Sequence, residues 1–183
     1  MELTFLGTSS MVPTKDRNHA GIFLTYRNEG ILFDCGEGMQ RQFKIAAIPL
    51  HKITKILITH WHGDHVLGLP GVMQTLSATN YEGTLKIYGP IGTKKRIDAL
   101  FEAFVFDRKL EFEVIEAKEG IFFENRDFVL EALEMDHGIE TLAFRFAEKD
   151  TRKIDMKKAK KLGLCEGPLI GKLQQGSAIE HKG

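Results

Sequence analysis

Several features are scarce in this chain, and each absence narrows what the protein can be. No apolar run approaches the roughly 18 residues that a transmembrane helix needs. The amino terminus shows no basic region followed by an apolar stretch and a cleavage site, so export is not expected. Cysteine occurs twice, without close spacing. We therefore expect Cys35 and Cys165 to be reduced thiols of a cytoplasmic protein, not a disulfide.

An excess of charge of either sign is also missing. The chain carries 25 basic and 25 acidic residues, which gives a formal net charge of zero. That balance argues against a surface that is positive throughout, but local clustering matters more than the sum for nucleic-acid binding. Such a cluster exists between residues 149 and 161, where seven residues are basic and two acidic. With 183 residues, 43% hydrophobic and 27% charged, the chain is expected to form one soluble globular domain.

The most informative segment is residues 59–65, the histidine loop, which reads Thr-His-Trp-His-Gly-Asp-His. It places three imidazoles and a carboxylate within six positions, at His60, His62, Asp64 and His65. Neutral imidazole nitrogens and carboxylate oxygens both suit zinc. The alternative, that these are ordinary polar side chains, is weak for so dense a pattern. The apolar run at residues 53–58 predicts a buried strand just before the loop, and ligands commonly bind at such strand ends.

The spacing within the histidine loop indicates two metal ions side by side. His60 and His62 can turn to one side, while Gly63 lets the chain bend so that Asp64 and His65 face another. Paired metals about 3.5–4 Å apart are typical of hydrolytic enzymes. His137 also follows an expected strand, and the adjacent glycine at position 138 leaves room beside it. By itself a histidine in that position is as consistent with a surface residue as with a ligand.

Periodicity and turn residues predict an alternation of strands and helices. Strands are expected at residues 2–6, 20–26, 31–34, 53–58, 84–88, 111–115, 120–123, 128–135 and 142–146, and helices at residues 36–47, 69–79 and 93–106. This order predicts an α/β layered domain. After residue 146 the apolar density falls and the charge density rises. That change predicts a boundary between residues 1–147 and residues 148–183.

The histidine loop resembles the signature of the metallo-β-lactamase superfamily. Further segments narrow the resemblance to ribonuclease Z, the tRNA 3′-processing endonuclease family: Phe5–Thr8, Pro13–Asn18, Phe33–Gln42 and His62–Gly71. Gly167–Gly176 is similar to the end of that family's protruding RNA-binding arm. The resemblance covers nearly all of the chain. The histidine loop alone would indicate only the superfamily, and it is the arm together with Gly36–Gln42 that selects this branch.

The resemblance implies a zinc-dependent endoribonuclease that removes 3′ trailers from precursor tRNA, with two Zn²⁺ ions in the intact active site. His60, His62 and His137 match the ligands of the first metal, and Asp64 and His65 match ligands of the second. Asp64 is also expected to be catalytic, because a carboxylate near a metal-activated water can orient or deprotonate it. The implied partners are precursor tRNA and a second copy of the chain in a homodimer. Neither a membrane nor a nucleotide cofactor is expected.

The implied fold is a four-layer αββα sandwich made of two similar halves. Residues 1–147 are expected to form mainly its amino-terminal half, and residues 148–183, the arm, are expected to bind RNA. In the arm, phosphate contacts are expected from Lys153, Lys157, Lys158, Lys160 and Lys161. For a charge run taken alone, a solvated helix face would be the better interpretation.

The chain departs from the family pattern after the arm. The family's second half supplies a bridging aspartate and further histidines, whereas the only histidine here after His137 is His181. We therefore expect a fragment of a longer protein, with a second chain supplying the rest as the alternative. Such a fragment should bind about one zinc, associate through its uncovered sheet face and fail to cleave precursor tRNA. Two other functions stay open, another hydrolase of this superfamily acting on small phosphodiesters or esters, and a non-catalytic metal- and RNA-binding module.

Overall fold

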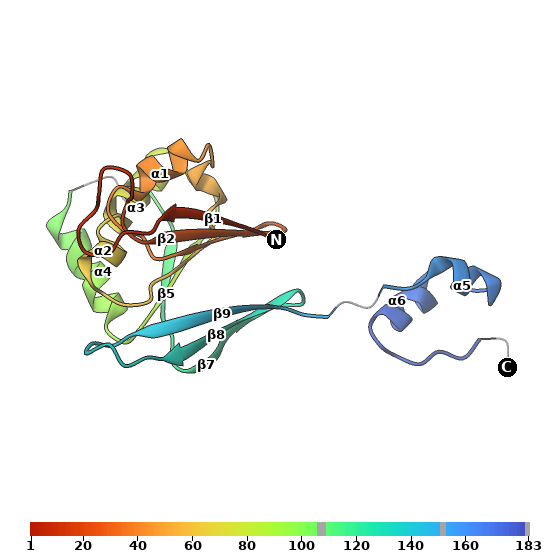
Figure 1. Cartoon of the computed structure of the whole chain (residues 1–183). Helices are drawn as coiled ribbons and strands as arrows, with labels where there is room; N and C mark the ends of the chain where they lie inside the picture. The colour runs from red at the N-terminus through yellow and green to blue at the C-terminus, as the bar shows by residue number, and fades with distance from the viewer. Residues whose placement is uncertain (106–108, 151–152, 182–183) are drawn as a thin grey trace. The chain divides into compact units, whose positions relative to one another are not determined.

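The structure is a computed structural model that describes residues 1–105, 109–150 and 153–181 (Figure 1). The chain divides into two compact units, residues 1–122 with 130–145 and residues 123–129 with 146–183. The functional division predicted after residue 147 stays a prediction. Among the described residues, no helix is long and apolar enough to cross a membrane.

The first unit is built on a six-stranded sheet with the order β1-β2-β3-β4-β5-β6. Its strands are β1 (Glu2–Gly7), β2 (Gly21–Tyr26), β3 (Glu29–Phe33), β4 (Lys55–Leu57), β5 (Leu85–Gly89) and β6 (Phe112–Glu116). The pairs β1–β2 and β2–β3 are antiparallel, whereas β3 to β6 pair in parallel. The carboxyl ends of these parallel strands meet at one edge of the sheet, which is where α/β proteins bind ligands.

Helices occupy the connections between the parallel strands. They are α1 (Met39–Ile45), the 3₁₀ turn η1 (Leu50–Lys52), α2 (Gly63–Val66), α3 (Leu69–Ala78) and α4 (Thr93–Ala103). The sequence of α3 explains its position. Leu69, Val72, Met73 and Leu76 repeat at helical spacing and are all buried, and Pro70 occupies the first turn, where a missing N–H costs nothing.

The main hydrophobic core lies between these helices and one face of the six-stranded sheet. Phe23 and Ile87 from the sheet belong to the same buried cluster as Phe43 of α1 and Ile97 of α4. The rings of Phe23 and Phe43 meet edge to face with centroids 5.0 Å apart. Each fully buried side chain of this size contributes roughly 1.5–3 kcal/mol of transfer free energy. This core fixes the strand ends that carry the candidate site.

The opposite face of the six-stranded sheet contacts a second sheet. It has the order β7-β8-β9, with strands β7 (Gly120–Glu124), β8 (Phe128–Glu134) and β9 (Leu142–Glu148). Phe33 lies 6.4 Å from Phe144, and Tyr88 lies 5.1 Å from Phe122, between ring centroids. In the first unit the layers therefore run helix, sheet, sheet (Figure 1). This layering confirms the predicted α/β layered domain.

The second unit contains two short helices, α5 (Met156–Lys161) and α6 (Pro168–Gln174). The Asp155 side chain caps α5 by accepting hydrogen bonds from the amides of Lys157 and Lys158. Ala159, Leu164 and Ile170 are buried in a small apolar cluster of their own. The arm is thus a folded element with a core, and its lysines lie on the outside of that core.

Most predicted elements are present, with differences at their ends. The helix predicted over residues 36–47 begins only at Met39, because Gly38 adopts a left-handed φ of 72°. The helix predicted over residues 93–106 ends at Ala103, and its predicted last residue lies outside the described residues. The histidine loop was expected to be irregular throughout, but Asp64 and His65 lie in the short helix α2. That helix sets the direction in which their side chains project.

Candidate metal centre

Three histidine side chains converge in the first unit. His60, His62 and His137, the histidine cluster, each offer one ring nitrogen, and these atoms all lie within 4.8 Å of one another. The ring centroids are 4.8 Å apart for His60 and each neighbour and 5.2 Å apart for His62 and His137. His60 is only 6% exposed, whereas the other two are exposed. Three convergent imidazoles with one open side could hold a metal ion.

Two segments distant in the sequence form the histidine cluster. His60 and His62 follow β4 at the carboxyl edge of the sheet, and His137 lies in the hairpin loop between β8 and β9. The amide of Leu142, at the start of β9, donates a 2.8 Å hydrogen bond to the carbonyl oxygen of Thr59. This bond ties the hairpin to the histidine loop, so the register of β9 determines where His137 lies.

The two glycines beside the ligands act differently from what the sequence suggested. Gly63 is the first residue of α2 and has no positive φ, so the change of direction does not depend on glycine there. The chain turns at His62, which is extended with φ −69° and ψ 147°. Gly138 has a φ of 78°, and nothing lies within 4 Å of a Cβ at that position. Gly138 is therefore needed for backbone conformation, not to leave room for His137.

Asp34 connects the histidine loop to the end of β3. Its Oδ1 accepts a 2.8 Å hydrogen bond from the Thr59 amide, and its Oδ2 accepts a 2.7 Å hydrogen bond from His65 Nδ1. The residue is 7% exposed and has a positive φ of 56°. A non-glycine residue in that conformation costs of the order of 1–3 kcal/mol. The Asp34 amide is held in place by a 2.9 Å hydrogen bond to the Leu57 carbonyl, which helps to maintain the strained conformation.

Thr59 determines which nitrogen of His60 is free. Its hydroxyl oxygen lies 3.0 Å and 2.9 Å from the two oxygens of Asp34 and 2.9 Å from His60 Nδ1. A carboxylate can only accept, so the hydroxyl donates to Asp34 and accepts from the Nδ1–H of His60. His60 Nε2 then keeps its lone pair. Asp34 holds His65 in the same way through Nδ1, so its Nε2 is turned away from Asp34.

Electrostatics keep His60 in the form that a metal requires. Burial, followed by the charge of the neighbouring His65, lowers the pKa of His60 to about 4 against the opposing effect of Asp34. His60 is thus neutral at pH 7, and no proton has to be displaced from Nε2. For His65, burial acts to lower the pKa, but the hydrogen bond and charge of Asp34, with the charge of Asp64, raise it overall. The pKa of His60 is therefore lowered and that of His65 is raised, although the two rings are neighbours.

Two further side chains that could bind a metal, Asp64 and His65, lie on α2 beside the histidine cluster. Asp64 is 8% exposed, and its Oδ2 lies 3.5 Å from His65 Nε2. The ring of His65 lies 4.0 Å from that of His60, between centroids. A Cβ at Gly36 would meet the Asp64 carbonyl oxygen at 2.5 Å, so glycine allows the loop after β3 to pack against α2. Four imidazoles and one carboxylate form a donor set that suits zinc.

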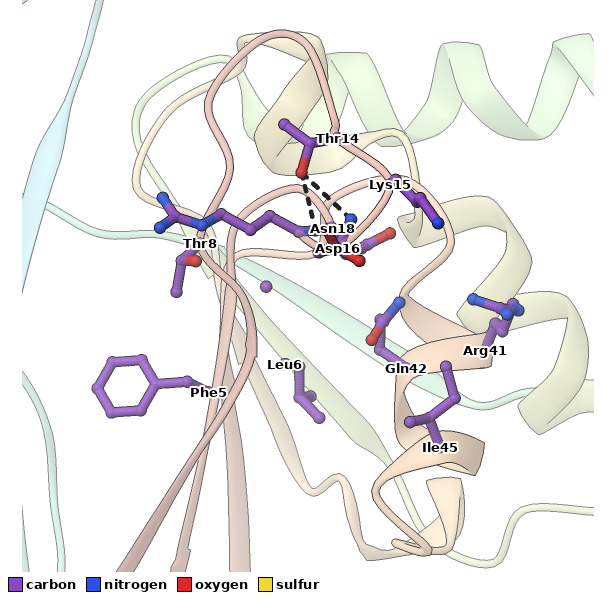
Figure 2. A pocket seen from close by; sticks show the side chains of 12 residues that line it. Phe5, Leu6, Thr8, Thr14, Lys15, Asp16, Asn18, Arg41, Gln42 and Ile45 are labelled. Atoms are coloured by element: carbon purple, nitrogen blue, oxygen red, sulfur yellow. Dashed lines mark hydrogen bonds between the residues drawn. The ribbon is translucent and has the colours of Figure 1, made fainter.

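Two hollows open near the carboxyl edge of the sheet. One, of about 510 Å³, reaches Asp34, Thr59 and His65 and is lined on its apolar side by Phe5, Ile22, Phe33 and Phe144. The other, of about 480 Å³, shares part of β1 with it and is shown in Figure 2. Its wall contains the exposed cationic residues Lys15, Arg17 and Arg41 together with the exposed carboxylate of Asp16.

The structure brings together every site residue that the sequence indicated in the first unit. The neighbours that hold them were harder to foresee, namely the Thr59 hydroxyl and the contact between Trp61 and Thr93. A side-chain oxygen directly before the first histidine was the only available signal for Thr59. Cys35, expected to be a reduced thiol, is fully buried, and burial followed by the charge of Asp34 raises its pKa. That environment favours an inert thiol.

The lysines of the arm lie in the second unit. Lys153, Lys157, Lys158, Lys160 and Lys161 are all exposed. Three of them occupy the last turn of α5, where positive charge is also favourable for the helix itself. Lys149 forms an ion pair with Glu124, and Arg152, part of the same basic run, lies outside the described residues. Exposure leaves these side chains available to a ligand.

Comparison with solved structures identifies the fold class of the chain. The helix–sheet–sheet layers match the short form of human tRNase Z with a TM-score of 0.74 and 32% sequence identity, over 81% of this chain and 65% of that one. The metallo-β-lactamase fold protein YhfI from Bacillus subtilis matches with a TM-score of 0.63 and 18% identity, over 79% of this chain and 58% of that one. The chain therefore has a metallo-β-lactamase fold.

Comparison of the amino-acid sequence with known proteins identifies the family. The family model described as Anti-Pycsar protein Apyc1 matches residues 1–149, and the chain belongs to that family. The resemblance to ribonuclease Z is confirmed as well. Ribonuclease Z of Methanothermobacter thermautotrophicus is 43% identical over 179 residues, and that of Methanocaldococcus jannaschii is 40% identical over 184. These matches cover 98% and 99% of this chain but 58% of each relative. The chain thus spans little more than half the length of the ribonucleases that it matches.

Proposed function

We propose that this chain carries the metal centre of an endoribonuclease that removes 3′ trailers from precursor tRNA. The observation that carries the proposal is the convergence of the histidine cluster with Asp64 and His65 at one edge of the sheet. Similarity to ribonuclease Z supports the substrate class, and at 98–99% of the chain it extends into the arm, beyond the end of the family match at residue 149. The arm is the part of the chain that a tRNA substrate would require and a small substrate would not.

The residues fit a centre for two zinc ions. His60, His62 and His137 would hold the first ion through ring nitrogens that lie within 4.8 Å of one another. Asp64 and His65 would hold the second, with the remaining ligands supplied from outside this chain. When bound, the two ions would lower the pKa of a water molecule towards about 7 and neutralise charge that develops on the attacked phosphate.

The protein's own groups orient the reaction. Asp64 would accept the proton of the attacking water, because its buried carboxylate lies beside His65, 3.5 Å from that ring's Nε2, and a carboxylate within reach of a metal-activated water is a suitable base. Asp34 takes no proton in this scheme. It holds His65 by a 2.7 Å hydrogen bond and holds His60 through the Thr59 hydroxyl, so both rings keep Nε2 turned away from it. Prepositioned ligands reduce the reorganisation needed when substrate binds.

Binding of the RNA would involve two positively charged regions. In the arm, Lys153, Lys157, Lys158, Lys160 and Lys161 would contact phosphates as point charges and position the substrate without reading its sequence. In the first unit, the pocket in Figure 2 would accept backbone phosphates beside Lys15 and Arg41. On the strength of the resemblance, we also propose that the protein acts as a homodimer in the cytoplasm.

A second candidate function is hydrolysis of small phosphodiesters or esters at the same centre. The extent of the family match favours it, because residues 1–149 contain the whole histidine cluster and exclude most of the arm. A non-catalytic metal- and RNA-binding module is the remaining alternative. In that case the incomplete second donor group, Asp64 with His65, would not assemble a working centre.

One set of assays separates these functions. The natural protein at full length should contain two zinc ions by elemental analysis and should cleave a precursor tRNA at the base of its 3′ trailer. Chelation should abolish cleavage, and zinc should restore it. Preference for a small phosphodiester such as bis(p-nitrophenyl) phosphate, with no cleavage of precursor tRNA, would support the second candidate. One zinc or none, with RNA binding but no hydrolysis, would support the module.

A further inference from the structure

Trp61 lies between two members of the histidine cluster, and its side chain is held by a different part of the fold. Its indole Nε1–H donates a 2.9 Å hydrogen bond to the hydroxyl of Thr93, the first residue of α4. That hydroxyl is fully buried and in turn donates to the Pro90 carbonyl at 2.7 Å. The indole also packs against the main hydrophobic core. The backbone that carries His60 and His62 is therefore connected through one side chain to the start of α4.

The start of α4 is itself fixed at several points. The Thr93 amide donates to the Pro90 carbonyl at 3.1 Å. The carboxylate of Glu116, at the end of β6, accepts hydrogen bonds from the amides of Gly92 at 2.9 Å and Lys94 at 3.1 Å. A Cβ at position 89 would lie 2.5 Å from the Thr93 hydroxyl, so glycine there allows the close approach. Thr93 is thus a firm attachment point.

Arg96 completes the surroundings of the indole. Its guanidinium lies over the Trp61 ring, 5.7 Å from the ring centroid, which is within the range of a cation–π interaction. The ring is consequently contacted by the core, by Thr93 and by Arg96. Few conformations are open to a side chain held in this way.

We propose that Trp61 is a positioning residue for the metal centre, and that it fixes the separation of the His60 and His62 imidazoles by anchoring the backbone between them to Thr93. The inference rests on the proposed metal centre. Within the described part of the chain, Asp34 and Thr59 form hydrogen bonds that restrain His60 and His65 but none with His62, whose ring is exposed. The anchor at Trp61 supplies a restraint on that side. Ligands held at the spacing of a bound ion lose less freedom on binding, so affinity for the metal should depend on this anchor.

The test measures metal affinity in the natural protein at full length, without RNA. Zinc affinity is obtained by competition with a chelator, and the geometry of the site from the visible absorption of bound Co²⁺. Trp61→Phe keeps an aromatic ring but removes the N–H, and Thr93→Val removes the acceptor. Each should weaken zinc binding by about tenfold, in the range found when supporting contacts of metal ligands are lost. Both variants remove the hydrogen bond between Trp61 and Thr93, and Thr93→Val also removes the bond from Thr93 to Pro90. The double variant should therefore bind zinc about as weakly as Thr93→Val alone.

Two controls separate positioning from general stability. Tyr81→Phe also removes one aromatic hydrogen bond, the 2.8 Å bond from Tyr81 to the Ile53 carbonyl, but it does not touch the histidine loop. It should lower the melting temperature of the metal-free protein about as much as Trp61→Phe, by roughly 2–4 °C for a loss near 1 kcal/mol, and leave zinc affinity unchanged. Thr93→Ser keeps the hydroxyl and should bind zinc as the wild type does.

The outcomes distinguish this inference from the proposed function. Wild-type zinc affinity in Trp61→Phe and Thr93→Val would overturn the inference and leave the metal centre standing. Weaker binding of precursor tRNA by Trp61→Phe at unchanged zinc affinity would also overturn it, because it would show a half-buried ring that stacks on a base instead. A wild-type protein that binds no metal would overturn the inference and the proposed function together.

Discussion

His65 and Asp34 are joined by a 2.7 Å hydrogen bond from Nδ1 to Oδ2, although they lie 31 positions apart in the sequence. The same carboxylate receives the amide and hydroxyl of Thr59, and through that hydroxyl it restrains His60. One buried acid thus orients a ligand from each of the two donor groups. Its left-handed backbone, at φ 56°, is the strained conformation from which it reaches both.

Loss of the Asp34 carboxylate should therefore weaken metal binding without removing any ligand. For Asp34→Ala we expect zinc affinity to fall by roughly 10–100-fold, because His65 loses the partner that fixes its tautomer and the Thr59 hydroxyl that orients His60 loses its acceptor. Competition with a chelator measures the change. Asp34→Asn keeps the size of the side chain and one acceptor oxygen, so it should retain more affinity than alanine. A change smaller than about threefold in the alanine variant would contradict the role given to Asp34.

Asp64 is expected to contribute to chemistry far more than to substrate binding. In the full-length protein, Asp64→Ala should lower turnover of precursor tRNA by several orders of magnitude, since it removes both a ligand and the general base. Affinity for the tRNA should stay nearly unchanged, because the phosphate contacts lie elsewhere. Single-turnover cleavage and a filter-binding assay measure the two separately. A fall of less than about tenfold would be weaker than the roughly 10²–10⁴ expected from general base catalysis alone and would remove this role.

The sequence predicted the regular elements well, because their signals are local. The apolar spacing of Leu69 and Leu76 indicated α3, and the β-branched run around Ile56 indicated β4. The beginning of α1 was predicted three residues too early, because glycines at its start permit a left-handed turn that composition does not reveal. The helical conformation of Asp64 and His65 was also missed, since α2 has only four residues and no periodicity.

The candidate site was predictable only where its residues are close in sequence. His60 and His62 stand two positions apart, so the pattern was visible directly. His137 was included through the family resemblance, because its place depends on a backbone bond between β9 and Thr59. The contacts of Asp34 and of Thr93 join residues that lie 25 to 32 positions apart. No local pattern predicts such contacts, and only the packing of β3, β4 and α4 reveals them.

The arm should contribute to binding of large substrates only. Replacing Lys153, Lys157, Lys158, Lys160 and Lys161 by alanine should weaken precursor tRNA binding and flatten its dependence on salt, because fewer counterions are released. Hydrolysis of a small phosphodiester should be nearly unchanged, since the histidine loop is untouched. The matched control replaces the same five lysines by arginine, which keeps the charge and should keep both activities. Equal losses on the two substrates in the alanine variant would contradict an RNA-binding role for the arm.

The low pKa of His60 should make the metal-free protein sensitive to mild acid. In the unfolded chain a histidine titrates near 6.5, whereas burial lowers the pKa of His60 in the folded chain to about 4. Between these values the unfolded state binds a proton that the folded state does not, so the stability contributed by neutral His60 falls as the pH drops through this window. The slope from one such group is at most about 1.4 kcal/mol per pH unit.

Denaturant unfolding of the chelated protein at pH 6.5, 5.5 and 4.5 measures this loss, and His60→Gln isolates its source. The variant cannot take up the proton, so its stability should depend less steeply on pH than that of the wild type. His65 acts in the opposite sense, because its raised pKa stabilises the folded state at low pH and loses that contribution as the pH rises through its folded value. The contribution of His60 is therefore measured as the difference in stability between the wild type and His60→Gln at each pH, because the wild-type curve contains both effects. Equal slopes for the two proteins, or a His60 ring resonance that titrates near 6.5 in the NMR spectrum of the metal-free protein, would contradict the assignment of a buried, neutral ring.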